Sequence, residues 1–155
     1  MLVQSGTPEQ TEAFGARLAA AKPATLERVA IVYLTGDLGA GKTTLARGFL
    51  RACGVTGTVR SPTYTLVESY GAGGITIVHL DLYRLRDPSE LEPLGLRDLA
   101  HANHLWLIEW PERGGGRLPP ADLTLALEVA AKTHPITASA GTALGAAWLN
   151  RMPTA

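Results

Sequence analysis

The sequence predicts an α/β fold with a mainly parallel central sheet and an antiparallel hairpin portion. A β-branched apolar run at residues 29–34 leads through a glycine-rich turn into a helix-forming segment at residues 42–52. Two strand-like runs, residues 65–70 and 75–80, are separated only by Gly71 to Gly74, which is typical of a hairpin. Strands that alternate with helical segments form parallel sheets, so the hairpin is expected to supply the antiparallel part.

A helix is expected to begin at Pro8. Thr7 can cap it, Pro8 suits the first helical position, and Gln10 completes a capping box. An apolar face then continues as far as Pro23, through Phe14, Leu18 and Ala21.

The strand-like run Val29 to Leu34 contains no breaker, as expected for a strand that is buried on both faces. The segment Gly36 to Thr44, GDLGAGKTT, follows it and matches G-x-x-x-x-G-K-[ST]. Its glycines permit backbone angles that turn successive N–H groups toward phosphate oxygens, and a helix N-terminus adds positive potential. The segment therefore predicts a phosphate-binding loop.

Within this loop, Lys42 is expected to reach the outer phosphates and Thr43 to ligate Mg²⁺. The alternative is a glycine-rich turn with a chance Lys-Thr pair, but strand, motif and helix follow one another in register, which favours the phosphate loop. The residues expected to bind the nucleotide here are Gly36, Asp37, Leu38, Gly39, Ala40, Gly41, Lys42, Thr43 and Thr44.

Two acids end strand-like runs further along the chain. Asp81 follows residues 75–80, and Glu109 follows residues 105–108. The carboxyl ends of strands border the ligand crevice in open α/β sheets. Phosphoryl-transfer sites need an acid for the Mg²⁺ shell and a group that orients the attacking water or acceptor, so either acid can be the one on the metal side. A cap or a salt bridge is the alternative role for each acid. Trp110, beside Glu109, is expected to line the nucleotide or partner surface.

Ser61-Pro62-Thr63 lies where many phosphate-loop proteins carry a segment that senses the terminal phosphate. The hydroxyls of Ser61 and Thr63 can approach phosphate or Mg²⁺, although turn chemistry alone equally supports a serine-proline turn that enters a strand. Four histidines lack a metal-ligand spacing, so no zinc site is expected; they are His79, His101, His104 and His134.

The remaining segments extend the same pattern. Asp87 to Leu91 predicts a short helix that ends at Pro93 or Gly95, and a loop is expected around residues 114–120. Leu123 to Val129 suits a further strand, and Gly141 to Leu149 is the candidate for a terminal helix.

Composition indicates one domain spanning residues 1–155, because 155 residues with 46% hydrophobic content can bury one substantial core. The 14 basic and 14 acidic residues cancel, so bulk charge does not favour nucleic-acid or membrane binding. A single cysteine, Cys53, excludes an internal disulfide and suits a reducing compartment. With no secretory signal and no long apolar run, a cytoplasmic location is expected.

Five segments occur in an order and spacing that resemble the TsaE (YjeE) family, the small bacterial ATPases needed to make threonylcarbamoyladenosine in tRNA. They are GDLGAGKTTLARGFL, SPTYTLVESY, HLDLYRL, LGLRD and LIEWPER. The resemblance covers roughly residues 7–130, and it adds a P-loop NTPase-like three-layer sandwich to the expected fold. It implies that ATP binds at Gly36 to Thr44 and that Mg²⁺ lies near Thr43 and Glu109. It also implies that Asp81 is a second catalytic or nucleotide-site acid and that Ser61 to Thr63 is a switch-like segment.

The resemblance further implies work with the TsaB and TsaD proteins, in which ATP hydrolysis resets the modification complex between turnovers. The resemblance implies that this protein contacts tRNA only indirectly, through that complex, and that it does not bind a membrane. The catalytic residues implied are Lys42, Asp81 and Glu109. Lys132, or the segment Thr7 to Thr11, is expected to contact the adenosine side.

Three other functions are consistent with a phosphate loop. A small-molecule kinase usually needs a mobile lid that bears arginines, for which Gly114 to Arg117 is the one short candidate. A GTP-dependent switch is disfavoured because N-K-x-D is absent, and an ATP-binding scaffold needs no turnover. Arg60 precedes the switch-like segment and Arg84 follows Asp81, but neither has a recognisable position for reaching a terminal phosphate. Slow turnover by the isolated chain is therefore expected.

Overall fold

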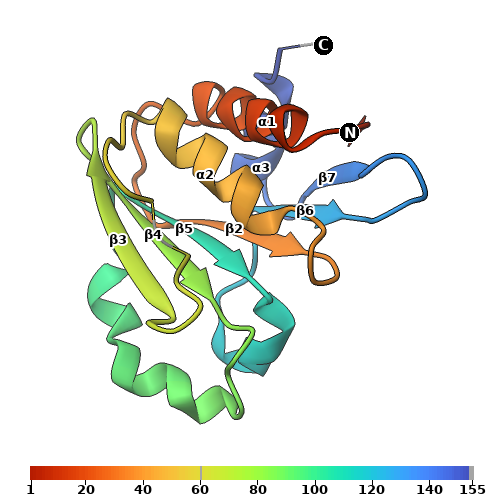
Figure 1. The fold of residues 1–155 in the computed structure, drawn as a ribbon. Coiled ribbons are helices and arrows are strands. Elements are labelled where there is room, and N and C mark those ends of the chain that lie inside the picture. Colours follow the sequence, from red (N-terminus) through yellow and green to blue (C-terminus); the bar gives the residue numbers. More distant parts are fainter. Residues whose placement is uncertain (60, 154–155) are drawn as a thin grey trace.

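One mixed sheet organises the computed structural model, which describes residues 1–59 and 61–153 (Figure 1). Its strands are β1 (Leu2–Val3), β2 (Ala30–Thr35), β3 (Val67–Ala72), β4 (Ile75–Asp81), β5 (His104–Glu109), β6 (Leu123–Leu127) and β7 (Ile136–Ala140). They lie in the order β1-β7-β6-β2-β5-β4-β3. The four central strands are parallel, whereas β3 at one edge and β7 and β1 at the other pair antiparallel. The predicted sheet and hairpin are therefore confirmed.

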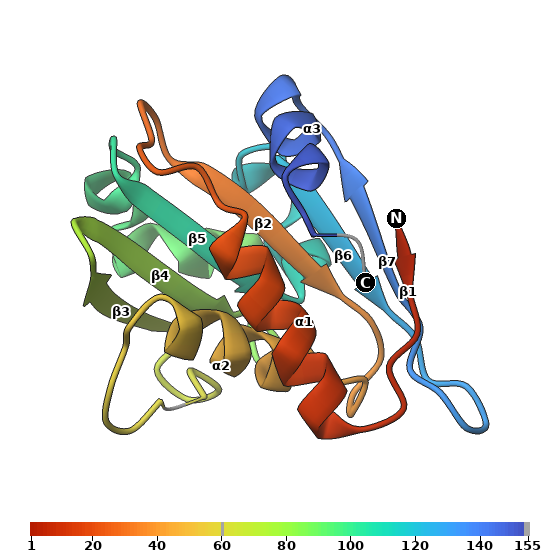
Figure 2. The ribbon, with the colours of Figure 1, turned by 90° about the horizontal axis from the view of Figure 1, so that it is seen from above.

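Helices cover both faces of this sheet, which confirms the predicted three-layer arrangement. The α-helices α1 (Pro8–Ala20), α2 (Lys42–Ala52) and α3 (Ala143–Asn150) lie on one face (Figure 1). Figure 2 shows α1 and α2 beside each other and α3 next to β7. The opposite face carries three 3₁₀ segments, η1 (Pro88–Leu94), η2 (Leu96–Leu99) and η3 (Pro111–Arg117). No helix in the described part of the chain is both long and apolar enough to cross a bilayer.

Alternation along the central strands divides the core into two clusters. On β4, Ile75 and Ile77 join the cluster beneath the α-helices, while Val78 and Leu80 join the cluster on the 3₁₀ side. Successive side chains of a strand point to opposite faces of the sheet. A strand whose two faces are both covered therefore needs apolar residues at odd-numbered and even-numbered positions alike. This is why the central runs contain no breaker.

The start of α1 follows the predicted capping pattern in part, because Gln10 accepts the N–H of Gly6 rather than that of the cap residue Thr7. The Thr7 hydroxyl accepts a hydrogen bond from the Gln10 N–H at 3.1 Å, and the Gln10 side chain accepts one from the Gly6 N–H. Farther along, α1 packs closely on α2 at Gly48, where a Cβ atom would lie 2.2 Å from the Glu12 carbonyl oxygen. Any larger residue at position 48 would therefore push the two helices apart.

The C-terminal part of the chain differs from expectation in two respects. β6 ends at Leu127 rather than near Val129, and β7 was not predicted at all. The reason is that β7 has the sequence ITASA, in which only Ile136 and Ala138 are buried, so its apolar signal is weak. The predicted loop at residues 114–120 is also partly wrong, because η3 continues to Arg117. The terminal helix is confirmed as α3.

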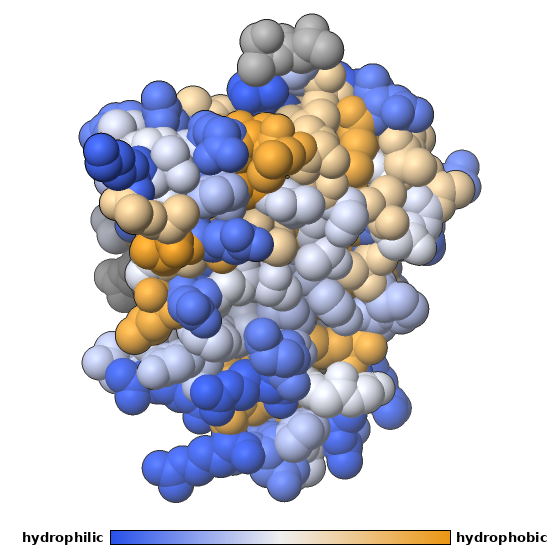
Figure 3. Space-filling model, turned by 90° about the vertical axis from the view of Figure 1, so that its right-hand side faces the viewer, coloured by the Kyte–Doolittle hydropathy of each residue, from blue (hydrophilic) through white to orange (hydrophobic). Residues whose placement is uncertain are grey.

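The molecular surface differs between the two sides of the sheet. Figure 3 shows apolar patches on the half that carries the α-helices and a mainly hydrophilic surface around the 3₁₀ segments. Exposed apolar side chains also lie at the β1 edge of the sheet and in the β6–β7 connection, where Leu2 and Val129 are 63% and 57% exposed. These exposed side chains are few, as is usual on protein surfaces, and they carry no functional argument on their own.

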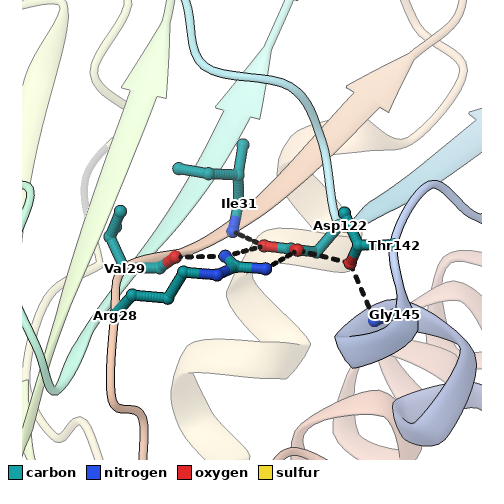
Figure 4. Close-up of polar contacts among 6 residues, drawn as sticks. All are labelled: Arg28, Val29, Ile31, Asp122, Thr142 and Gly145. Carbon is teal, nitrogen blue, oxygen red and sulfur yellow. Dashed lines mark hydrogen bonds and ion pairs between the residues drawn. The ribbon is translucent and has the colours of Figure 1, made fainter.

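A buried carboxylate joins three elements at the amino end of the parallel strands (Figure 4). Asp122 accepts two hydrogen bonds from Arg28 at 2.7 and 3.0 Å, one from the Ile31 N–H at 2.8 Å and one from the Thr142 hydroxyl at 2.6 Å. Thr142 in turn caps α3 by accepting the Gly145 N–H at 3.2 Å. Asp122 thus ties the starts of β2, β6 and α3 together.

These donors decide the ionisation of Asp122. Burial alone would raise its pKa, but the hydrogen bonds from Arg28, Thr142 and the Ile31 N–H, with the charge of Arg28, outweigh burial and lower it. The folded pKa therefore lies below the unfolded value of about 3.9. A carboxyl group of this kind contributes stability above its unfolded pKa and loses that contribution as pH falls through its folded pKa.

We predict that Asp122→Asn lowers the free energy of unfolding by about 2 kcal/mol at neutral pH, because charge-assisted hydrogen bonds to a buried group are lost. The difference between the two proteins should shrink as pH falls below the unfolded pKa of about 3.9 and through the lower pKa of Asp122 in the folded protein. Urea unfolding across a pH series measures both effects, with the exposed Asp98→Asn as a matched control. A difference that stays constant down to the acid transition would contradict the assignment.

Candidate functional site

The glycine-rich loop joins the carboxyl end of β2 to the first residue of α2, as the motif predicts. Gly36, Gly39 and Gly41 all have positive φ, at 139°, 82° and 105°. At Gly36, a Cβ atom would also lie 2.2 Å from the carbonyl oxygen of Leu127 at the end of β6. The loop can therefore lie against β6 only with glycine at this position, and its backbone is free to turn N–H groups inward.

Lys42 lies within this loop and is 5% exposed. Its Nζ donates to the carbonyl oxygens of Gly36 and Asp37, the latter at 2.9 Å, and lies 4.2 Å from the centre of the Trp110 ring. Burial lowers the pKa of Lys42, and nearby acids, Glu109 first among them, oppose that change. The ammonium group is thus held at the mouth of the loop by carbonyl dipoles and an aromatic face.

Thr43 and Glu109 meet directly. The Thr43 hydroxyl donates to Glu109 at 2.8 Å from Oε1 and 3.1 Å from Oε2, so the start of α2 contacts the end of β5. The second Glu109 oxygen also lies 2.7 Å from Nε2 of the buried His79 on β4. Thr43 and Glu109 offer only oxygen atoms to a cation. Mg²⁺ prefers such ligands and usually takes the rest of its shell from phosphates and water, so this pair fits that ion.

Asp81 ends β4 directly beside Glu109, because the two residues are paired in the parallel ladder. It accepts a hydrogen bond from the Tyr83 N–H at 3.0 Å and one from the Thr63 hydroxyl at 3.4 Å. Burial is the largest influence on its pKa and raises it, and the Glu109 charge acts in the same direction. Ser61 is farther out, with its hydroxyl 2.6 Å from that of Thr63.

These groups line one cavity of about 450 Å³. Its lining includes Leu38, Gly39, Gly41, Lys42, Thr43, Thr44, Thr63, Asp81, Tyr83, Arg84, Glu109 and Trp110. The structure thus brings together the loop, both acids and the threonine of the switch-like segment, whereas Ser61 is not among the lining residues. Arg60 lies outside the described residues.

A smaller cavity of about 110 Å³ lies on the other side of the loop. It is lined by Thr7, Pro8, Thr11, Gly39, Ala40, Gly41, Thr44 and His134. The predicted Thr7 to Thr11 segment is therefore adjacent to the loop. Lys132 is exposed in the β6–β7 connection and lines neither cavity, while its neighbour His134 does.

Aromatic and cationic side chains form one wall of the larger cavity. The Tyr83 and Trp110 rings are 5.0 Å apart, and Arg113 lies 5.6 and 5.9 Å from them. Trp110 has a φ of 58°, an unusual left-handed backbone conformation for a bulky residue. Arg84 stacks on Tyr64 at 4.7 Å, and Tyr64 is 83% exposed. Sequence reasoning singled out Trp110 but missed its partners, since stacking across two loops leaves no local pattern.

The family model described as "Threonylcarbamoyl adenosine biosynthesis protein TsaE" matches residues 5–136, which is most of the chain. The chain belongs to the TsaE family. The matched region contains the phosphate loop, both acids and the switch-like segment, and it ends at the first residue of β7.

Individual relatives agree with this assignment. The TsaE protein of Haemophilus influenzae is 51% identical over 119 residues, which cover 77% of this chain and 75% of the relative. The TsaE protein of Bacillus subtilis is 39% identical over 122 residues, covering 78% and 73%. Among solved structures, that of Bacillus subtilis YdiB superposes with a TM-score of 0.79 at 28% identity, covering 98% of this chain and 93% of that one. The TsaE resemblance predicted from the motifs is therefore confirmed.

Proposed function

We propose that this protein is a Mg²⁺-dependent ATPase required for threonylcarbamoyladenosine modification of tRNA. One observation carries the ATPase part of the proposal: Lys42, Thr43, Asp81 and Glu109, which come from three elements, line a single cavity at the mouth of a glycine-rich loop. The role in tRNA modification is supported by family membership and by the names of the relatives. We also propose a cytoplasmic location, in keeping with a role in tRNA modification.

Each residue has a role in ATP hydrolysis under this proposal. The N–H groups of Gly36 to Thr44 and the Lys42 ammonium bind the phosphate oxygens, and Thr43 and Glu109 hold Mg²⁺. When bound, the ion neutralises charge that develops on the phosphates. Asp81 orients a water molecule that attacks the γ-phosphorus, the bond from that phosphorus to the bridging oxygen breaks, and ADP departs with the electron pair. The raised pKa of Asp81 makes it a better acceptor for the water proton than an ordinary aspartate.

We place the adenosine beside the smaller cavity. The Thr7 to Thr11 segment and Lys132 are the proposed contacts on that side. His134 is a further candidate, because it lines this cavity with Thr7 and Thr11. Apolar and backbone contacts commonly hold adenine, so few charged groups are needed there.

TsaB and TsaD are the proposed partners, and hydrolysis by this chain resets their complex between turnovers. The switch-like segment offers a means of coupling, because Thr63 contacts Asp81 inside the cavity while the next residue, Tyr64, is exposed. A partner that contacts Tyr64 would therefore be sensitive to changes at Asp81. tRNA is reached only through the complex.

The kinase alternative has less support than the ATPase. Its candidate lid, Gly114 to Arg117, belongs to η3, where Arg117 pairs with Glu92 at 3.5 Å, and none of its residues lines the larger cavity. A nucleotide-dependent binding switch uses the same cavity and differs from the ATPase only in turnover. Rates of hydrolysis separate these functions.

We predict that Lys42→Ala reduces ATP hydrolysis roughly 10²- to 10³-fold, because one preorganised positive charge at the phosphates is lost. Single-turnover assays measure the change. Lys22→Ala, a lysine outside both cavities, is the matched control and should hydrolyse ATP at the normal rate. Unchanged hydrolysis by Lys42→Ala would contradict the assigned role.

Glu109→Gln should weaken Mg²⁺-dependent hydrolysis more than it weakens ADP binding without Mg²⁺, because a carboxylate ligand is replaced by a neutral amide. Magnesium titrations of hydrolysis and calorimetry of ADP binding in EDTA measure the two quantities. The exposed Glu128→Gln controls for the change of charge. Equal loss of both quantities, together with a lower melting temperature, would show that Glu109 is structural.

The isolated chain is predicted to hydrolyse ATP slowly and to be stimulated by the TsaB–TsaD pair. The pair can supply charge in trans, which raises phosphoryl-transfer rates by up to roughly 10³- to 10⁵-fold in other phosphate-loop proteins. Steady-state assays with and without the pair measure this. A fast basal rate that the pair leaves unchanged would refute the proposal and favour a kinase.

A further inference from the structure

The buried side chain of His79 has no role in the chemistry proposed above. His79 lies on β4, two residues before Asp81, and its exposed fraction is zero. It is on the same face of β4 as Ile77 and Asp81, beneath α2. A histidine in a fully covered position needs an explanation, because an apolar residue would be accommodated there without loss of hydration.

Its only hydrogen bond in the described part of the chain is to the proposed metal ligand. Nε2 lies 2.7 Å from Oε2 of Glu109, whereas Nδ1 is buried without a partner among the described residues. A carboxylate accepts hydrogen bonds and cannot donate them, so Nε2 carries the proton. The ring thus leaves one nitrogen unsatisfied and directs the other to Glu109, which is a poor arrangement for stability alone.

The two oxygens of Glu109 consequently have different surroundings. Oε2 is held by His79 at 2.7 Å, and Oε1 is the oxygen nearer to the Thr43 hydroxyl, at 2.8 Å. The terminal torsion of a glutamate is broad, so a carboxylate without a fixed contact samples many orientations. A donor on the far oxygen restricts that rotation and fixes the direction of the near one.

We infer that His79 is a positioning residue that holds Glu109 in the orientation needed for Mg²⁺. This inference rests on the proposed function, since it concerns the same metal ligand. Groups that hydrogen-bond to a metal ligand typically change metal affinity roughly 10- to 100-fold when they are removed. Two other acids lie near His79 and have other partners. Glu68 on β3 accepts a hydrogen bond from the Thr65 hydroxyl at 3.1 Å, and Asp81 accepts hydrogen bonds from the Tyr83 N–H and the Thr63 hydroxyl.

Two amide variants separate positioning from packing. The amide of His79→Gln reaches about as far as Nε2, whereas that of His79→Asn reaches only as far as Nδ1, so the pair differs mainly in whether Glu109 is contacted. Mn²⁺ is the probe, and its affinity for each protein with ADP is measured from the electron paramagnetic resonance of the free ion. ADP affinity in EDTA and the melting temperature are measured alongside.

We expect His79→Asn to bind Mn²⁺ roughly 10- to 100-fold more weakly than the unaltered protein, and His79→Gln to remain close to it. ADP affinity without metal should be the same in all three proteins. Equal Mn²⁺ affinity in both variants, whether normal or reduced, would overturn the inference. A third variant, His79→Leu, fills the buried position with an apolar side chain. If neither His79→Asn nor His79→Leu unfolds cooperatively, the inference is also overturned, because His79 would then be needed for the fold itself and not for the orientation of Glu109.

The unaltered protein distinguishes this inference from the proposed function. If it binds neither ADP nor Mn²⁺ with ADP, the proposed function fails and the inference fails with it. If it binds both and the two amide variants behave alike, the inference alone is wrong. The assignment of Glu109 itself is tested separately by Glu109→Gln.

Discussion

The candidate site depends on the parallel pairing of three adjacent strands. Leu34 on β2 pairs with Glu109 on β5, which pairs in turn with Asp81 on β4. This row places the start of the phosphate loop and both acids at the same end of the sheet, before any side-chain contact is considered. A shift of one residue in either pairing would turn an acid to the opposite face and away from Thr43.

Buried charge has opposite consequences at the two ends of this sheet. Asp122, at the amino end, accepts hydrogen bonds from Arg28, Ile31 and Thr142, and its pKa falls despite burial. Asp81, at the carboxyl end, accepts fewer hydrogen bonds and lies beside another acid, and its pKa rises. The first environment stabilises a fixed anion, while the second favours a group that takes up a proton. The same residue type therefore supports the fold in one place and, under the proposed function, ATP hydrolysis in the other.

Much of this arrangement is predictable from the sequence, because strand, motif and helix carry strong local patterns. Glu109 and Asp81 were identified from their positions after apolar runs, which the strand register then brought together. His79 cannot be singled out from the sequence, since a single histidine within an apolar run has the same pattern as a packing residue. His134 was missed for a different reason: it reaches the loop through the unpredicted turn between β6 and β7. The roles of all the site residues, Ser61 and Lys132 included, remain predictions.

The pairing of β1 with β7 also bears on how the chain folds. Leu2 lies opposite Thr137, so two strands that are far apart along the chain pair with each other. Bringing such distant segments together has an entropic cost that earlier contacts must first reduce, and long-range strand pairing is correspondingly slow. During synthesis on the ribosome, the N–H and C=O groups of β1 therefore lack their sheet partners until β7 has emerged. The exposed Leu2 side chain is at this edge, and an unpaired edge strand of this kind is a place where a chaperone or another strand can bind a nascent chain.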